Sequence, residues 1–415
     1  MEHFPQPGAH GYAWRDLLSR HEPYFPSLLP GGEAALSAAL LQSCGIGFED
    51  GHRATLLEND TVFDAIETAI RAARESVHVL VYIWRPCAAS DRLVAALQEK
   101  ARSGVACRVV VDPVGSEEIT GERDFDRRIE RALVSAGVQV HYYRLLSGRI
   151  RRRVVGRNHQ KLVIVDGRVG FTGGFGIWKV WEGDGRHPDS WRELSVRVEG
   201  PVVRQMQVAF ASGWQSSGGA LLPEAALRPP QPAGPARAAF VRSSGRLGVT
   251  EAERMYRLVF GAARERLWIT NAYFNPPNPV LTLLEDKCRQ GVDVRVLAPG
   301  PHHDVVPIRA AQRSTYPRLL RAGVRIWEYQ PAMLHAKTAI VDDWLSVIGS
   351  INLDTLSLNK LVESALLITD RGLHEALVRA FEGDLRCARE MRLPYRVGPY
   401  ARLSRRATEA LGRGR

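Results

Sequence analysis

The 415-residue chain is poor in cysteine and contains no long hydrophobic run. Its five cysteines are widely spaced and include no CxxC pair, which predicts neither a disulfide framework nor a zinc site. No stretch approaches the roughly 18 consecutive apolar residues of a membrane-spanning helix, and the best candidate, 77–84, suits a buried strand. The first residues show no basic segment followed by an apolar one, so we expect no signal peptide and a cytoplasmic location.

The chain is basic, with a formal net charge of +11 at pH 7. This excess implies a polyanionic partner, but it does not choose between nucleic acid, anionic lipid and the general background of cellular anions. Arginines gather in one segment among leucine, isoleucine and valine residues, and they are Arg144, Arg149, Arg151, Arg152, Arg153 and Arg157. Cations mixed with apolar side chains suit a lipid headgroup region, and a solvated basic loop is the alternative.

The two halves of the chain repeat the same order of segments. AIRAARESVHVLVYIW at 69–84 corresponds to VFGAARERLWITNAYF at 259–274, and AGVQVHYY at 136–143 corresponds to AGVRIWEY at 322–329. Helical stretches alternate with apolar strands in both copies. The pattern predicts an α/β fold of two pseudo-symmetric α/β/α halves, each with a mixed, mostly parallel sheet, and an active site at their interface.

The composition between and around the repeats predicts the domain limits. A stretch with SSGG and RPPQPAGPAR disfavours helix and strand and indicates a linker. We expect an N-terminal region of unassigned role at 1–50, a first half at 51–216, the linker at 217–238, a second half at 239–395 and a basic tail at 396–415.

One motif occurs once in each half. The first copy reads NHQKLVIVDGRVGFTGG and the second LHAKTAIVDDWLSVIGS, with identical spacing. The His-x-Lys pair opens an apolar run typical of a strand, where residues two apart face the same side. A single copy would be weak evidence, but the duplication favours one site built from both halves. The motif residues are His159, Lys161 and Asp166 in the first copy, and His335, Lys337 and Asp342 in the second.

The duplicated pattern HxKx4Dx6G[GS] resembles the paired motifs of the phospholipase D superfamily. Flanking segments, among them GSINLDTLS from 349 and SWRELSVRVEGP from 190, resemble bacterial cardiolipin synthases. The shorter class without N-terminal transmembrane helices, cardiolipin synthase B, is most similar in length and in the sequence of these segments. The resemblance covers about residues 51–395. It implies a phosphatidyltransferase of phospholipid biosynthesis that makes cardiolipin from phosphatidylglycerol and releases glycerol.

The chemistry of a phosphodiester explains why two His-x-Lys pairs suit this reaction. Its negative charge repels nucleophiles, so a catalyst needs cations on the non-bridging oxygens, a nucleophile and an acid for the leaving alcohol. We expect Lys161 and Lys337 to hold the phosphoryl oxygens while one histidine forms a phosphohistidine and the other protonates the alcohol. The repeat alone does not decide which histidine attacks. The resemblance implies that His159 is the nucleophile and His335 the acid–base group.

The resemblance also implies helper residues and two departures from the family pattern. Ser350 and Asn352 are expected to contact phosphate, whereas Glu193 and Glu363 are expected to orient the histidines; an ordinary salt bridge would explain either glutamate as well. The two motif aspartates are expected to fix local geometry more than to touch substrate. Gly176 stands where the first motif usually continues with Asn, and Leu361 replaces an Asn two residues before Glu363.

Lysines occupy the places where a metallophosphodiesterase would need carboxylates and further histidines, so we expect no metal and no cofactor. A hydrolytic phospholipase D and a nuclease of the same superfamily are the alternatives, and a non-catalytic membrane scaffold is a third. We expect peripheral attachment to the inner face of the cell membrane through the arginines at 149–157, with an anionic phospholipid surface as partner. Neither an obligate protein partner nor nucleic acid is expected.

Overall fold

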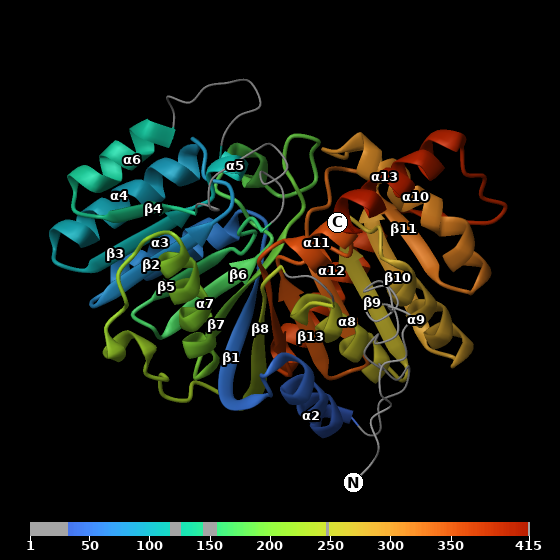
Figure 1. The fold of residues 1–415 in the computed structure, drawn as a ribbon, viewed down its shortest axis with the longest axis horizontal. Helices are drawn as coiled ribbons and strands as arrows, with labels where there is room; N and C mark the ends of the chain where they lie inside the picture. Colours follow the sequence, from blue (N-terminus) through green and yellow to red (C-terminus); the bar gives the residue numbers. More distant parts are fainter. Residues whose placement is uncertain (1–31, 117–125, 144–155, 246–248, 414–415) are drawn as a thin grey trace, which may run out of the picture.

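The computed structural model describes residues 32–116, 126–143, 156–245 and 249–413. Within these ranges one sheet runs through the whole molecule, and helices cover both of its faces (Figure 1). Its strands follow the order β15-β11-β10-β9-β12-β13-β14-β8-β1-β7-β6-β5-β2-β3-β4. Apart from the edge strand β15, this order is symmetric about the boundary between β8 and β1, so the repeat in the sequence is a repeat in space.

The first half contains these strands and helices, in chain order: β1 (Glu49–Glu58), α3 (Thr61–Ala72), β2 (Ser76–Val81), α4 (Ala88–Arg102), β3 (Ala106–Val111), α5 (Pro113–Ser116), α6 (Asp126–Ser135), β4 (Gln139–Tyr142), β5 (Leu162–Val165), β6 (Val169–Gly173), the 3-10 turn η2 (Lys179–Trp181), β7 (Leu194–Glu199) and α7 (Val202–Ser216).

The second half follows the same plan and adds elements at its end: the 3-10 turn η3 (Glu224–Leu227), β8 (Ala236–Ser243), α8 (Glu251–Ala262), β9 (Arg266–Asn271), α9 (Asn278–Arg289), β10 (Asp293–Pro299), α10 (Val306–Arg321), β11 (Arg325–Tyr329), β12 (Lys337–Val341), β13 (Leu345–Gly349), α11 (Thr355–Lys360), β14 (Glu363–Ile368), α12 (Arg371–Leu385), β15 (Ala388–Met391) and α13 (Pro399–Arg413). The N-terminal helix α2 (Gly32–Cys44) packs on α8.

The α/β class and the two pseudo-symmetric halves are confirmed, but the expectation of mostly parallel strands is wrong. Only β2-β3-β4 and β9-β10-β11 pair in parallel among the described strands; the other pairings are antiparallel. The reason is that short turns fold β5 onto β6 and β12 onto β13 as hairpins. The two sheets are also joined, because β1 pairs with β8. Asp-Gly between the apolar runs LVIV and VGFTG was the available hairpin signal.

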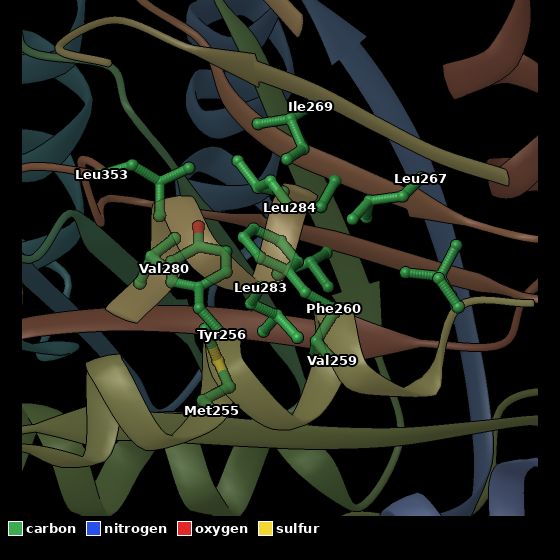
Figure 2. Packing of buried hydrophobic residues seen from close by; sticks show 14 of the residues in the cluster. Met255, Tyr256, Val259, Phe260, Leu267, Ile269, Val280, Leu283, Leu284 and Leu353 are labelled. Carbon is green, nitrogen blue, oxygen red and sulfur yellow. The ribbon is translucent and has the colours of Figure 1, made fainter. Parts of the chain in front are cut away.

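Alternate residues of each strand face opposite helical layers, as the pleat of a strand requires. In the second half, Leu267 and Ile269 on β9 pack against α8 and α9 (Figure 2). The intervening Trp268 faces the other side and stacks on Phe381 of α12, with ring centroids 5.1 Å apart. This second layer, with α7 and α12, forms one apolar cluster that contains residues of both halves. The shared core fixes the two halves against each other and thereby fixes the groups at their interface.

None of the helices in the described ranges is long and apolar enough to cross a membrane. The segment 217–235 joins α7 to β8 with only the short turn η3 in it. The division into five domains stays a prediction.

Candidate active site

Each His-x-Lys segment leads into a central strand and is held by backbone hydrogen bonds to the opposite half. The N–H of His159 donates to the carbonyl of Val362 at 2.8 Å, just before β14. The N–H of His335 donates to the carbonyl of Arg192 at 2.7 Å, just before β7. Parallel bridges Asn158↔Val362 and Arg192↔Leu334 flank these bonds. The pseudo-two-fold arrangement therefore brings each motif next to the residue that precedes a glutamate of the other half.

Those glutamates bind the histidine rings across the interface. Nδ1 of His159 lies 2.9 and 3.0 Å from the two carboxylate oxygens of Glu363. Nδ1 of His335 lies 2.7 Å from Oε2 of Glu193. A neutral imidazole paired in this way carries its proton on Nδ1 and leaves the lone pair of Nε2 available for attack or for proton transfer. We call the six residues His159, Lys161, Glu193, His335, Lys337 and Glu363 the His–Lys cluster.

The two lysines of the cluster are buried beside the histidines. Nζ of Lys161 donates to the carbonyl of His159 at 2.5 Å. Nζ of Lys337 donates to the carbonyl of His335 and lies 2.9 and 3.1 Å from the ring nitrogens of the same histidine. Burial lowers the pKa of Lys161 to about 7 and that of Lys337 to about 8. Both ammonium groups are therefore poorly solvated, and a bound anionic ligand would stabilise their charged forms.

The same burial acts on the acids and bases of the cluster. Burial, together with the charge of Lys337, lowers the pKa of His335 to about 4. The pKa of His159 is also lowered by burial, and the charges of Lys161 and Lys337 contribute. Lys337 belongs to the other half, so its effect on His159 indicates that the two motifs share one electrostatic environment. Burial raises the pKa of both glutamates, but the charges and hydrogen bonds of the neighbouring histidines and lysines together outweigh it, so both pKa values are lowered.

Two different kinds of donor hold the two glutamates. Ser350 Oγ donates to Glu363 Oε2 at 2.5 Å, and Ser357 Oγ donates to Oε1. Glu193 instead accepts from the Trp181 indole at 3.4 Å and from the backbone N–H of Leu194 at 3.0 Å. Trp181 and Ser357 each lie twenty-two residues beyond their motif histidine, so they are equivalent in the repeat. The sequence analysis did not identify either residue. Extending the alignment of the two motif copies to these positions would have shown that they correspond.

The replacement of Asn by Gly176 has a steric cause. A Cβ atom at position 176 would lie 2.7 Å from the ring of Trp181 and 3.2 Å from Ile83. A Cβ atom at Gly174, which corresponds to Ser350, would lie 2.5 Å from Glu193. The large indole therefore fills the space that small polar side chains occupy in the second half. The site is asymmetric because a tryptophan holds one glutamate and two serines hold the other.

Aromatic rings also distinguish the surroundings of the two histidines. His335 is packed by Trp181, Trp191 and Tyr273, with centroid distances of 5.3, 5.0 and 6.3 Å. His159 meets the edge of Tyr82 at 4.9 Å. The side chain of His159 is 12% exposed and that of His335 is 6% exposed, so His159 is the more accessible ring. Tyr273 lies in the segment NAYFNPP at 271–277, directly after β9.

The motif aspartates lie at the far end of their strands. Asp166 accepts backbone N–H groups of Arg74, Glu75 and Ser76 at the start of β2. Asp342 does the same for residues 264–266 at the start of β9. Four strand residues separate each aspartate from its lysine, which corresponds to roughly 17 Å of extended chain. The structure thus brings together the histidines and lysines of the motif and places its aspartates in the hairpin turns, where Asp166 and Asp342 have positive φ.

The structure contradicts the role expected for Arg157. We expected it to bind lipid headgroups, but its side chain is 8% exposed and forms a buried ion pair with Asp112 at 2.6 Å. It lies directly before the first motif, where it anchors the end of β3 to the His-x-Lys segment. The other proposed headgroup residues, Arg149, Arg151, Arg152 and Arg153, lie outside the described residues.

The remaining helper residues lie close to Glu363. Ser350 binds Glu363 directly, as described above. Asn352 acts one step away, because its backbone N–H donates to Ser357 Oγ at 2.8 Å and so supports the serine that holds Glu363. The side chain of Asn352 is buried at 3% exposure. Within the described ranges no group of three or more His, Cys, Asp or Glu side chains could hold a metal ion. The absence of a metal requirement stays a prediction.

Comparison with known proteins follows the two halves of the chain. A family model described as "Cardiolipin synthase, PLD-like domain" matches residues 66–214 and 258–385. The chain is 34% identical over 339 residues to a cardiolipin synthase A of Pseudomonas fluorescens strain Pf-5, which covers 81% of this chain and 69% of the relative. It is also 34% identical over 333 residues to a cardiolipin synthase A of Pseudomonas aeruginosa strain PAO1, covering 79% and 66%.

Solved structures share the fold. The phosphatidylserine synthase of Haemophilus influenzae Rd KW20 matches with a TM-score of 0.68 at 15% identity, over 90% of this chain and 99% of that one. The polyphosphate kinase of Porphyromonas gingivalis matches with a TM-score of 0.52 at 13% identity, over 87% and 56%. At these identities the likeness concerns the architecture alone.

Proposed function

The chain belongs to the family of cardiolipin synthases with phospholipase D-like domains, and from this premise we propose that it transfers a phosphatidyl group from one phospholipid to a hydroxyl group of another. The donor and the acceptor are both phosphatidylglycerol, and the products are cardiolipin and glycerol. Membership confirms the resemblance to the phospholipase D superfamily. The two relatives named above are of class A, so the closer likeness to class B stays a prediction. The observation that carries the proposal is the pair of histidines, each bound through Nδ1 to a glutamate of the opposite half.

The reaction proceeds in two displacements on one phosphorus atom. Lys161 and Lys337 hold the non-bridging oxygens of the donor and offset the charge that repels a nucleophile. Nε2 of His159 attacks phosphorus and the bond from phosphorus to the glycerol oxygen breaks. His335 enters this step as the imidazolium, which Glu193 stabilises through Nδ1, and donates its Nε2 proton to that oxygen. His335 then takes the proton of the acceptor hydroxyl, whose oxygen attacks phosphorus as the bond to His159 breaks. The phosphatidyl group is held on His159 between the two steps.

The assignment of His159 as the nucleophile has support from its surroundings. Its ring is the more exposed of the two, which suits contact with phosphorus. Glu363, held by Ser350 and Ser357, fixes the ring and stabilises the positive charge that develops on imidazole during attack. His335, packed among aromatic rings, is better placed to exchange a proton in a site protected from water.

The experiment that tests this function is incubation of the purified protein with vesicles of labelled phosphatidylglycerol. We expect labelled cardiolipin and free glycerol in equal amounts. Accumulation of phosphatidic acid would instead indicate a hydrolytic phospholipase D. Cleavage of nucleic acid without any lipid turnover would indicate a nuclease, and no turnover of either would indicate a scaffold.

The lysines predict the alkaline side of the pH dependence. Below a pKa of about 7 for Lys161 and about 8 for Lys337, both ammonium groups are charged and bind the phosphodiester; above these values the charges are lost. On the acidic side, protonation of His159, whose pKa is below its ordinary value, removes the attacking lone pair. We therefore expect a bell-shaped plot of kcat/KM, reporting the coupled groups together.

The variant Lys161→Arg separates the contribution of Lys161 to the alkaline limb of the pH profile from that of Lys337. Arginine stays charged at every pH of the assay, so the limb should move upward toward the pKa of Lys337. The pH profile of kcat/KM measures this shift. A profile that is flat across the neutral range in both proteins would contradict the assignment of the lysines.

We propose that the enzyme attaches to the inner face of the cell membrane through α13. The exposed face of this helix carries Tyr400, Leu403, Ala407 and Ala410, and Arg402 and Arg406 are exposed beside it. An apolar stripe flanked by cations suits an anionic bilayer surface.

α13 packs on α10 and α11 (Figure 1), and Asn275 Nδ2 donates to Thr408 Oγ1 at 2.9 Å. Asn275 lies two residues after Tyr273, whose ring contacts His335, so α13 lies on the His335 side of the cluster. The arginines at 149–153 would add to the attraction.

The double variant Tyr400→Ser/Leu403→Ser should bind vesicles less tightly. These side chains are 56% and 65% exposed, and insertion of each contributes roughly 1.5–3 kcal/mol if fully buried, so partial insertion predicts a loss of about tenfold or more. Sedimentation with phosphatidylglycerol vesicles measures it. Leu41→Ser is a matched control, because Leu41 is 58% exposed on α2, at the opposite edge of the molecule (Figure 1). If the double variant binds the vesicles as tightly as the control variant does, α13 is not the membrane-binding surface.

A further inference from the structure

A second polar group lies on the His335 side of the cluster and is not used by the mechanism above. The hydroxyl of Tyr273 donates to Oδ2 of Asp304 at 2.5 Å. Asp304 Oδ1 lies 3.3 Å from Nδ1 of His303, a ring that also accepts the N–H of Val305 at 2.9 Å. Tyr273 presents its ring edge-on to His335. A single aromatic residue therefore connects this group to the proposed acid–base histidine.

Asp304 can accept further hydrogen bonds. A carboxylate has about four lone-pair positions, and the Tyr273 hydroxyl occupies one of them. The Asp304 side chain is 26% exposed, so it reaches solvent at the edge of the site. Its charge is also felt inside, because it raises the pKa of His335 and of Lys337 against the lowering caused by burial. The carboxylate thus lies between bulk solvent and the reacting groups.

The described part of the first half offers no equivalent accessible carboxylate at the matching strand end. There Asp112 follows β3, but it is 1% exposed and its oxygens bind the guanidinium of Arg157. Ser116, which corresponds to His303 in the repeat, is buried and accepts the N–H of Trp84 at 3.1 Å. Glu117, which corresponds to Asp304 in the repeat, lies outside the described residues. Among the described residues, an accessible carboxylate lies beside His335 and a neutralised one lies near His159.

We infer that Tyr273 and Asp304 form an alcohol subsite that recognises the vicinal diol of a glycerol headgroup. This rests on the proposed function, in which His335 protonates the departing alcohol and deprotonates the incoming one, so both alcohols occupy the His335 side in turn. One hydroxyl reacts at phosphorus, and the neighbouring hydroxyl donates to Asp304. A carboxylate accepts hydroxyl donors and repels a phosphate group, so it selects an uncharged polyol at this position.

The test compares two acceptor alcohols that differ by one hydroxyl group, 1,2-propanediol and 1-propanol, in transfer from labelled phosphatidylglycerol. The wild-type protein should prefer the diol, and Asp304→Asn should reduce that preference by roughly ten- to a hundredfold, as expected for the loss of a hydrogen bond to a charged acceptor. Transfer to 1-propanol should change little. Glycerol and phosphatidylglycerol, offered in parallel, show whether the free alcohol and the headgroup use the same subsite.

Asp343→Asn is the matched control, since Asp343 is exposed in the turn after β12, at the end of the strand remote from the cluster. An unchanged diol preference in Asp304→Asn would overturn the subsite, as would an equal loss with both alcohols. In those cases the wild-type protein still makes cardiolipin, and the proposed function stands. A wild-type protein that turned over no phospholipid would overturn the proposed function and the subsite with it.

Discussion

His159→Ala is expected to lower the rate of cardiolipin formation by about 10⁴-fold or more, because loss of a covalent nucleophile removes the first displacement altogether. The fold should persist. Glu363, which loses its histidine partner, still accepts hydrogen bonds from Ser350 and Ser357. The rate is measured with labelled phosphatidylglycerol, and the thermal midpoint of unfolding shows that the variant is intact.

His187→Ala serves as the control for this prediction. The side chain of His187 is 73% exposed and lies outside the His–Lys cluster, so its removal should change the rate by less than about twofold. Activity of His159→Ala within tenfold of the wild-type value, in a folded protein, would exclude His159 as the nucleophile.

Lys337→Met is expected to act on activity and stability in opposite directions. The ammonium group would stabilise charge on the phosphoryl oxygens, and loss of one such group costs about 10²- to 10³-fold in kcat. In the folded protein, however, burial lowers the pKa of Lys337 from 10.5 to about 8, so the folded state binds this proton more weakly than the unfolded chain. The charged lysine therefore destabilises the fold at neutral pH, and an apolar side chain of similar length should raise the thermal midpoint.

The pH dependence of this stability difference follows from the same pKa shift. The cost of the charged lysine is complete below a pH of about 8, falls as the pH rises toward 10.5 and vanishes above it. The gain in midpoint of Lys337→Met should shrink over that interval. Lys100→Met, on α4 in the outer layer, is the control and should change neither property much. A variant with full activity, or one whose midpoint at neutral pH is no higher than that of the wild-type protein, would contradict the role given to Lys337.

The repeat made the architecture and the composition of the cluster predictable. Equal spacing in two copies predicts that His159 lies beside Lys161 and His335 beside Lys337. The partners across the interface, Glu193 and Glu363, came only from the resemblance to a family. Strand order and the direction of pairing depend on turns and on long-range hydrogen bonds, so the antiparallel hairpins after each motif were misjudged.

The asymmetry of the site could not be predicted from residue types alone. That Gly176 is small because Trp181 fills its space is a packing relation, visible only when both residues are placed. Arg157 was misassigned for a similar reason. It belongs by composition to an arginine-rich segment, yet its position directly before the first motif places it inside, against Asp112. A charged residue next to a buried strand often has a buried partner, and the sequence does not name that partner.

The central claim is that one phosphodiester is cleaved by both halves of the chain, with the lipid fragment held on His159. It is tested most directly by mixing the protein with phosphatidylglycerol, quenching within a turnover and analysing the peptides by mass spectrometry. A phosphatidyl adduct on the peptide that contains His159, absent from His159→Ala, is the predicted result. An adduct on any other residue, or steady turnover without an adduct at any quench time, would contradict the claim.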